Sequence, residues 1–153
     1  MKTRIAGLIF MFVFSTQTTI LASSSPVSVN EKTLKAFRDA YPHAEKVVWK
    51  ENEEYYFVYF RDNGIFSQID YDHDGNFQCS LRYYNDANLL PPQLALELQK
   101  KYPTKTVFGI TETSSQSNNT TFFIKLEDAH SWTSVKGTAD GYIRVTEKLN
   151  KQL

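Results

Sequence analysis

The sequence holds little that could cross-link or catalyse. Cys79 is the only cysteine among 153 residues, so no intramolecular disulfide can form. It lies in "FQCSL", where Phe77, Cys79 and Leu81 alternate and are predicted to share one face. A reactive thiol needs a lowered pKa and a nearby base, and the sequence shows neither. We therefore expect a buried, unreactive thiol.

An excess of one charge is also lacking. The 17 basic and 17 acidic residues give a formal net charge of +0, and neither sign forms blocks along the chain. Partners such as nucleic acid or an anionic membrane usually require a basic patch or run. The balance argues against both kinds of partner.

The apolar run near the N-terminus, residues 5–14, is too short to cross a bilayer, because a spanning helix needs about 20 apolar residues. Two basic residues precede this run, and small residues follow it at positions 22–24. This order is typical of a secretory signal peptide. We expect residues 1–23 to be cleaved and residues 24–153 to form one exported domain that is not inserted in the membrane.

Recognisable catalytic and metal-binding motifs are missing. The sequence has no Gly-x-Ser-x-Gly, no His-Glu-x-x-His and no Gly-rich phosphate loop. His43, His73 and His130 are scattered singly, whereas a zinc site needs three or four clustered ligands. We predict no catalytic residue, no metal and no cofactor. A carboxylate pair assembled only by folding would escape this search, which leaves an unrecognised hydrolase as an open alternative.

Three aspartates alternate in "IDYDHDGNF" before Gly75, as in the first half of a calcium-binding loop. The complete loop needs a bidentate acid at its twelfth position, which is Leu81 when counted from Asp70. No acid is present there. The stretch therefore predicts a turn between two strands.

The second half of the chain repeats the first. "LKAFRDAYPHAEKVVWKE" (34–51) overlays "ALELQKKYPTKTVFGITE" (95–112) without a gap, and the Tyr-Pro pairs of both segments coincide. A repeat unit of about sixty residues is too long for a solenoid, and two copies are too few for one. We interpret it as a duplicated subdomain, with repeat one at 28–86 and repeat two at 89–150.

Each copy begins with a predicted helix. In the first copy Ser28 and Glu31 have capping-box spacing, and in the second Pro91 and Pro92 occupy the entry and the first turn. Apolar residues then recur at helical intervals up to the Tyr-Pro pair. Proline disfavours helical geometry at the residue before it, so both helices should end there.

After each helix, β-branched and aromatic residues predict strands. Asn63-Gly64 and Asp74-Gly75 are two-residue hairpin signals, because these residues readily take the positive φ that such turns require. The predicted strands are 46–51, 54–61, 65–71, 76–84, 106–112, 120–127, 131–136 and 142–148. A helix and a four-strand meander, occurring twice, predict an α+β fold with an antiparallel sheet of about eight strands and both helices on one face.

With these motifs in view, "AFRDAYPHAEKVVWKENEEYYFVYF" and "IDYDHDGNF…LRYY…LLPPQL" resemble the PepSY-like family of bacterial periplasmic proteins. This family, typical of Bacteroidetes, is also described as beta-lactamase-inhibitor-like. The resemblance covers roughly residues 29–148 and includes no catalytic signature. It implies a tandem helix-plus-sheet fold like that of the inhibitor, which presents a concave sheet to its target. It also implies a location in the periplasm or beyond the outer membrane.

The unusual feature of the sequence is its aromatic content. In "YYFVYF" (55–60) both faces of the strand are apolar. A sheet with helices on one side has a second face, which is either exposed and aromatic, marking a binding surface, or covered by a partner or loop. A third reading is that the tyrosine rings pack while their hydroxyls stay in water. Trp, Tyr and Arg dominate interface energetics, so the candidate binding residues are Trp49, Tyr56, Arg82, Tyr83, Tyr84 and Trp132.

These observations predict a non-catalytic exported module that binds a protein or peptide through an aromatic sheet face, an enzyme inhibitor being one form. The alternative is a small-molecule or polysaccharide binder whose tyrosines and tryptophans stack on a ligand in the sheet's concavity. A broad, shallow face with a polar rim would favour a protein partner. A closed pocket of several hundred cubic ångströms would favour a ligand. The oligomeric state is left open.

Overall fold

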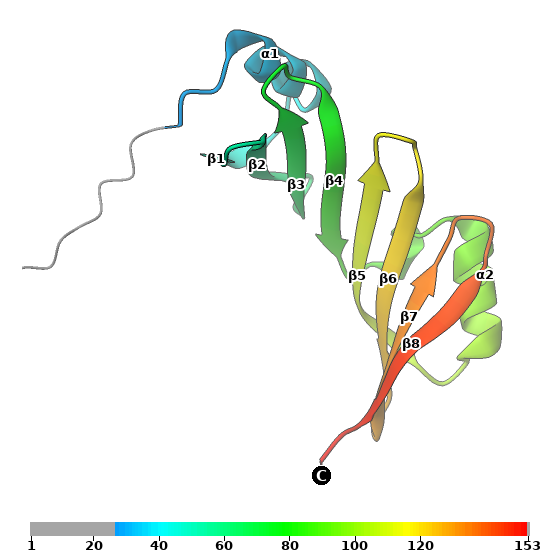
Figure 1. The fold of residues 1–153 in the computed structure, drawn as a ribbon. Helices are drawn as coiled ribbons and strands as arrows, with labels where there is room; N and C mark the ends of the chain where they lie inside the picture. The colour runs from blue at the N-terminus through cyan, green and yellow to red at the C-terminus, as the bar shows by residue number, and fades with distance from the viewer. Residues whose placement is uncertain (1–26, 153) are drawn as a thin grey trace, which may run out of the picture.

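An eight-stranded antiparallel sheet with two helices on one face makes up the computed structural model, which describes residues 27–152 (Figure 1). The predicted signal peptide lies outside these residues. The strands follow chain order, so each pairs only with its sequence neighbours. The predicted α+β arrangement of two helix-plus-meander units is confirmed.

All predicted strands are present, with bounds close to the expected ones. The first unit contains α1 (Glu31–Ala40), β1 (Glu45–Glu51), β2 (Tyr55–Asp62), β3 (Ile65–Asp72) and β4 (Phe77–Tyr84). The second unit contains a short 3-10 helix, η1 (Ala87–Leu89), then α2 (Pro92–Lys101), β5 (Thr106–Ser115), β6 (Thr120–Glu127), β7 (Ser131–Gly137) and β8 (Ile143–Asn150).

The first helix begins two residues later than a cap at Ser28 would place it. Asn30 is the N-cap, and its Oδ1 accepts hydrogen bonds from the Thr33 N–H at 2.8 Å and the Thr33 hydroxyl at 2.9 Å. The side-chain amide of Asn30 also donates to the His73 carbonyl at 2.6 Å, which ties the helix start to the β3–β4 turn. The predicted capping box is therefore wrong, because a stronger cap lies closer to the helix.

The remaining helix ends agree with the prediction. Helix α2 begins with Pro92 in its first turn. Both helices end at the tyrosine of the Tyr-Pro pair, where the Tyr41 N–H donates to Phe37 O at 2.9 Å and the Tyr102 N–H donates to Leu98 O at 2.8 Å. Each helix has 10 residues. None of the helices within residues 27–152 is long and apolar enough to cross a membrane.

The strand register shows that both helices cover the same face. Phe37 of α1 packs against Phe60 of β2, with ring centroids 5.0 Å apart. Directly opposed residues on neighbouring strands share a face. From Phe60 the opposed pairs continue through Ser67, Arg82 and Glu112 to Phe122. Phe122 belongs to the apolar cluster under α2, so this side is the helix face throughout.

Two apolar clusters fill the space under the helices. The α1 cluster consists of Phe37, Tyr56, Val58, Phe60, Ile69 and Tyr71. The α2 cluster consists of Tyr84, Leu90, Leu94, Leu98, Ile110, Phe122, Ile124, Leu126 and Val135. Figure 1 shows α1 beside the β1–β3 end of the sheet and α2 beside β7 and β8. The strip of the helix face between the two clusters, where Ser67, Arg82 and Glu112 lie, is therefore not covered by either helix.

The predicted two-residue turn at Asn63-Gly64 is confirmed. Asn63 has φ 50° and Gly64 φ 81°, and Asp62 pairs directly with Ile65 across the turn. Positive φ at both central residues is what a short hairpin turn of this hand requires.

The turn at Asp74-Gly75 is longer than the two residues predicted. The Asp72 N–H donates to Asn76 O at 3.0 Å, which encloses three residues, and Gly75 supplies the positive φ of 79°. The Asp72 carboxylate stabilises this wider turn by accepting from the N–H groups of Asp74 at 3.0 Å and Asn76 at 2.8 Å. Hydrogen bonds from Asn76 lower the pKa of Asp72 below its usual value. This carboxylate therefore serves the turn.

A β-bulge in β4 places Cys79 on the side opposite to Phe77. Tyr71 pairs with Phe77 while Asp70 pairs with Cys79, so Gln78 is the extra residue of the bulge. Phe77 packs against the α1 cluster, whereas Cys79 is exposed on the other face. The prediction of a shared face and a buried thiol is wrong, because one inserted residue reverses the alternation.

Strand β5 continues three residues beyond the predicted end at position 112. The Ser114 and Thr120 hydroxyls lie 2.9 Å apart across the β5–β6 hairpin. Asn118, with φ 58°, donates its N–H to Ser115 O at 2.9 Å and closes the turn. The serine- and threonine-rich stretch between the predicted strands 106–112 and 120–127 thus extends the sheet by backbone pairing, with a contact between hydroxyls across the strands.

The packing of α2 on β7 depends on Gly137. A Cβ at this position would lie 2.7 Å from Leu94 Cδ1 and 3.4 Å from the Tyr142 carbonyl oxygen, and Leu94 is fully buried. We expect Gly137→Ala to lower the free energy of unfolding by about 1–3 kcal/mol, measured by urea denaturation. Ser134→Ala, on the same strand but the opposite face, should change it by less than about 0.5 kcal/mol. Equal losses in the two variants would contradict this packing.

Candidate functional site

The sheet face opposite the helices carries aromatic side chains from six neighbouring strands. Within β2, residues alternate between this face and the buried positions Val58 and Phe60. Phe66 then pairs with Tyr83. Tyr83 and Phe123 both pair with the same β5 residue, Thr111. We call this surface the open face, and its aromatic residues are Tyr55, Phe57, Tyr59, Phe66, Tyr83, Phe108, Phe123 and Trp132.

Several of these rings contact one another along the open face. Tyr59 stacks on Phe66 with centroids 6.4 Å apart, and Phe108 meets Trp132 edge-on at 4.8 Å. Tyr83 lies over Gly109, where an added Cβ would come within 3.0 Å of the tyrosine hydroxyl. Yet Tyr83 is 48% exposed, Phe108 47% and Phe123 43%. Large contiguous exposed apolar patches are rare on monomeric proteins, and where they occur they usually mark an interaction site.

Lysine side chains lie over the rings of the open face. Two lysines contact Trp132: the Lys151 ammonium lies 4.2 Å from the ring centroid and the Lys125 ammonium 4.6 Å from it. Lys136 lies 5.7 Å from the Phe123 centroid, and Lys50 lies 5.3 Å from that of Tyr59. Such contacts are worth about 0.5–1 kcal/mol at exposed sites. The open face is therefore both aromatic and basic.

Acidic groups on the open face are mostly engaged by neighbours. Asp72 is held in its turn, as described above. Asp70 accepts from Gln68 Nε2 at 2.8 Å and from the Cys79 thiol at 3.1 Å. Glu127 pairs with Lys151 Nζ at 2.9 Å. Lys125 and Lys136 have no such ion pair within residues 27–152. The register also places Arg144 and Glu147 of β8 on this face, opposite Lys136 and Ser134. Four basic side chains, Lys125, Lys136, Arg144 and Lys151, therefore outnumber the two acidic ones, Glu127 and Glu147, around Phe123 and Trp132.

The six residues proposed from the sequence fall on two different faces. Tyr83 and Trp132 lie on the open face. Tyr56 and Tyr84 are only 7% and 6% exposed, under the helices. Trp49 packs edge-on against Phe37 at 5.4 Å, also on the helix side. The remaining residue, Arg82, lies on the uncovered strip of the helix face.

Arg82 joins a polar group that crosses from β4 to β5. Its Nη1 lies 3.3 Å from each carboxylate oxygen of Glu112, and the Tyr84 hydroxyl donates to Glu112 Oε2 at 2.9 Å. Burial, together with Glu112, raises the pKa of Tyr84 above its usual value. The tyrosine therefore stays protonated and acts as a fixed donor that orients Glu112 toward Arg82.

The open-face residues that the sequence reasoning missed are phenylalanines and lysines. Candidates were chosen by residue type, which favoured Trp, Tyr and Arg and passed over Phe66, Phe108, Phe123, Lys125 and Lys136. Alternation along each strand was the available signal, since residues two apart share a face. The bulge between Val107 and Gly109 hid Phe108 from that signal.

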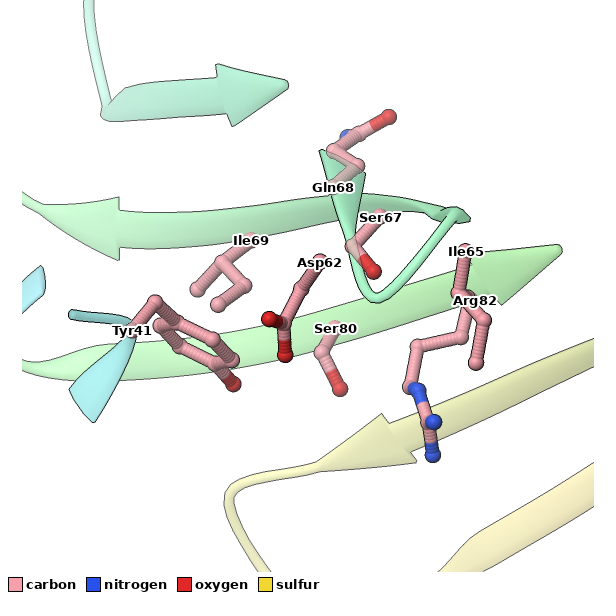
Figure 2. Close-up of a pocket in the computed structure, with 8 residues that line it drawn as sticks. All are labelled: Tyr41, Asp62, Ile65, Ser67, Gln68, Ile69, Ser80 and Arg82. Atoms are coloured by element: carbon pink, nitrogen blue, oxygen red, sulfur yellow. The ribbon is translucent and has the colours of Figure 1, made fainter. Parts of the chain in front are cut away.

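A smaller, partly open feature lies on the helix face. A cavity of about 190 Å³ opens between the α1 and α2 clusters, and Figure 2 shows its side chains. Its lining residues are Tyr41, Asp62, Ile65, Ser67, Gln68, Ile69, Ser80 and Arg82. In the part of the chain that the structure describes, no three His, Cys, Asp or Glu side chains form a group that could hold a metal ion.

Comparison with known proteins supports the fold. Neither a family model nor a curated protein matches the sequence. The structure is similar to a DUF2874 family protein from Bacteroides uniformis, with TM-score 0.59 and 17% identity, covering 80% of this chain and 90% of that one. It is similar to a BLIP-like protein from Bacteroides fragilis, with TM-score 0.60 and 16% identity over 81% and 87% of the two chains. A candidate periplasmic protein from Bacteroides eggerthii matches with TM-score 0.59 and 15% identity over 81% and 90%.

The thiol of Cys79 should be a poor nucleophile despite its exposure. Burial of the sulfur by its neighbours, and then the hydrogen bond and charge of Asp70, raise its pKa to about 11. We expect the rate of alkylation by iodoacetamide to rise with a midpoint near that value. Asp70→Asn should lower the midpoint, while Asp74→Asn, in the adjacent turn, should not. A wild-type midpoint at the ordinary thiol value would refute the Asp70 contact.

The two tryptophans offer a matched test of which face is core. Trp49→Ala removes packing against Phe37 and Tyr71 and should lower the free energy of unfolding by about 2–4 kcal/mol. Trp132→Ala removes two lysine–ring contacts and the edge contact with Phe108 on the open face and should cost about 1–2 kcal/mol, less than Trp49→Ala. Chemical denaturation of both variants measures the difference. The reverse order would mean that the faces are assigned wrongly.

Proposed function

We propose that this chain is a non-catalytic binding module of the cell envelope, which holds a protein partner on its open face. The fold shared with a BLIP-like protein supports a binding role. The sequence resemblance to PepSY-like proteins and the candidate periplasmic neighbour support an exported location. An inhibitor of an envelope enzyme is a specific case of this proposal.

The observation that carries the proposal is the extent of the open face. Rings from six strands lie side by side, and three of them, Tyr83, Phe108 and Phe123, keep more than two-fifths of their surface exposed. Aromatic residues are enriched in protein interfaces, and aromatic anchors dominate their energetics. The rings are spread across the sheet rather than gathered around one closed pocket, so the shape suits a protein surface better than a small ligand.

The charges specify the partner further. Lys125, Lys136 and Lys151 lie over rings at the Trp132 end of the open face. Lys151 is already paired with Glu127, but a carboxylate on the partner can form a hydrogen-bonded ion pair with Lys125 or Lys136, an interaction stronger than an exposed contact with a ring. We therefore expect a folded protein with an acidic contact surface. Its association should slow as salt is added, because exposed charges steer the encounter.

The experiment is a pull-down from envelope extract of the source organism, with the chain from residue 24 onward as bait. The test variant is Tyr83→Ala/Phe123→Ala/Lys125→Ala. The matched control, Tyr142→Ala/Leu96→Ala/Lys101→Ala, removes a tyrosine, an apolar residue and a lysine from exposed positions on the helix side. Thermal melts establish that both variants fold.

We expect the wild type and the control to capture one acidic protein that the test variant loses, with capture decreasing as salt is raised. A protein captured equally by both variants would show that the open face is not the binding surface. Capture of a basic protein would contradict the charge argument while leaving the surface in place.

A further inference from the structure

The cavity of about 190 Å³ lies where the two apolar clusters meet on the helix face (Figure 2). Ile69 on one wall belongs to the α1 cluster, and Ile65 on the other packs against the α2 cluster. Neither helix extends over this part of the sheet, so the strand residues here are polar where their neighbours on the same face are apolar. The cavity is separate from the open face.

Three hydroxyl groups line the cavity with their hydrogen-bonding capacity unused. Ser67 is only 5% exposed, and Tyr41 and Ser80 are half-buried. Figure 2 shows the Tyr41 and Ser80 hydroxyls on the same side of the strands as the Asp62 carboxylate. Within residues 27–152 no side-chain hydrogen bond involves any of the three hydroxyls. These three oxygens remain accessible to solvent, because Tyr102 carries the only fully buried, unpaired side-chain oxygen or nitrogen among the described residues. A ligand with hydrogen-bond donors can therefore replace water at them.

The charges in the cavity leave one carboxylate uncompensated. Asp62 accepts one side-chain hydrogen bond, from Asn63 Nδ2 at 3.3 Å, and no Lys or Arg in the described chain forms an ion pair with it. Arg82 is already paired with Glu112. Burial raises the pKa of the Tyr41 hydroxyl, Arg82 lowers it and Asp62 raises it, which indicates that both charges act on the cavity. The charges of Asp62, Arg82 and Glu112 together give a net charge of one negative unit in and beside the cavity.

We propose that this cavity binds a primary ammonium group on a short aliphatic chain. An ammonium has three donors and no acceptor, and the cavity supplies the Asp62 carboxylate and the hydroxyl oxygens of Ser67, Ser80 and Tyr41 as acceptors. The side chains of Ile65 and Ile69 and the ring of Tyr41 offer apolar contact for the chain. An anion would be repelled by Asp62, and Arg82 would offer it little attraction because it is already paired with Glu112. The ammonium belongs either to a free alkylamine or to a lysine side chain of a peptide.

The experiment titrates the chain from residue 24 onward with n-butylamine at low ionic strength. A separate titration uses lysine with its α-amino group acetylated and its carboxyl group amidated. Binding is followed by amide chemical shifts of Ser67 and Ser80. Neutral n-butanol serves as the matched ligand control. We expect saturable shifts with at least one amine and none with the alcohol. Binding of the blocked lysine alone would assign the site to peptides, and binding of both would include free amines.

Three variants locate the site. Asp62→Asn should weaken amine binding about tenfold or more, because it removes a charge-assisted hydrogen bond. Asp74→Asn, in the β3–β4 turn at the far end of the hairpin, should leave the affinity unchanged. Ser80→Val fills part of the cavity with a residue that strands tolerate, and it should also weaken binding. The open-face variant Tyr83→Ala/Phe123→Ala/Lys125→Ala should bind the amine normally.

Any of three results would overturn the proposal. The first is the lack of saturable binding for both amines to the folded wild type. The second is equal affinity in Asp62→Asn, and the third is equal binding of n-butanol; either of these would leave the carboxylate without a role. None of these results bears on the open face, so this inference and the proposed function can fail independently.

Discussion

The backbone ladder between β4 and β5 is the connection on which the rest of the structure depends. Six opposed pairs, from Cys79–Ser115 to Tyr84–Ile110, join the two helix-plus-meander units into one sheet. Tyr84 of β4 belongs to the α2 cluster, so the second core reaches across this junction. The Arg82–Glu112 pair adds a polar contact between the same strands. Without this ladder, two separate four-stranded meanders would each present a narrow face.

Both candidate sites follow from joining the two units edge to edge. On the helix side, two short helices cover the centres of their own units and leave the junction to polar residues, which creates the cavity around Asp62 and Ser80. On the other side, nothing interrupts the sheet, so rings from successive strands line up across it. The same geometry therefore gives a small cavity with polar lining residues and a broad aromatic surface, on opposite faces.

The sequence predicted the elements well because each rests on local chemistry. Proline and Tyr-Pro pairs mark the helix ends, and alternation with Asn-Gly or Asp-Gly marks the hairpins. Which face of each strand is buried could not be predicted, because both faces of "YYFVYF" are apolar. Adjacent residues on a strand point to opposite sides, so Tyr83 and Tyr84 could never both lie on one surface. The β4 bulge at Gln78 had no signal in the sequence, and it alone reversed the position of Cys79.

The pairing of every strand with its chain neighbours also shapes how the molecule can form. Each hairpin closes a short loop, so little chain entropy is lost before contacts form, and folding of such low-contact-order topologies is fast. A chain released N-terminus first can add one strand at a time, each new strand docking on the edge left by the one before. Strand β1 remains an outer edge of the sheet. The positive φ of Lys46 and the bulge between Glu45 and Val48 make this edge a poor template for pairing with a strand of another molecule. Growth of the sheet is thereby directed toward the C-terminus.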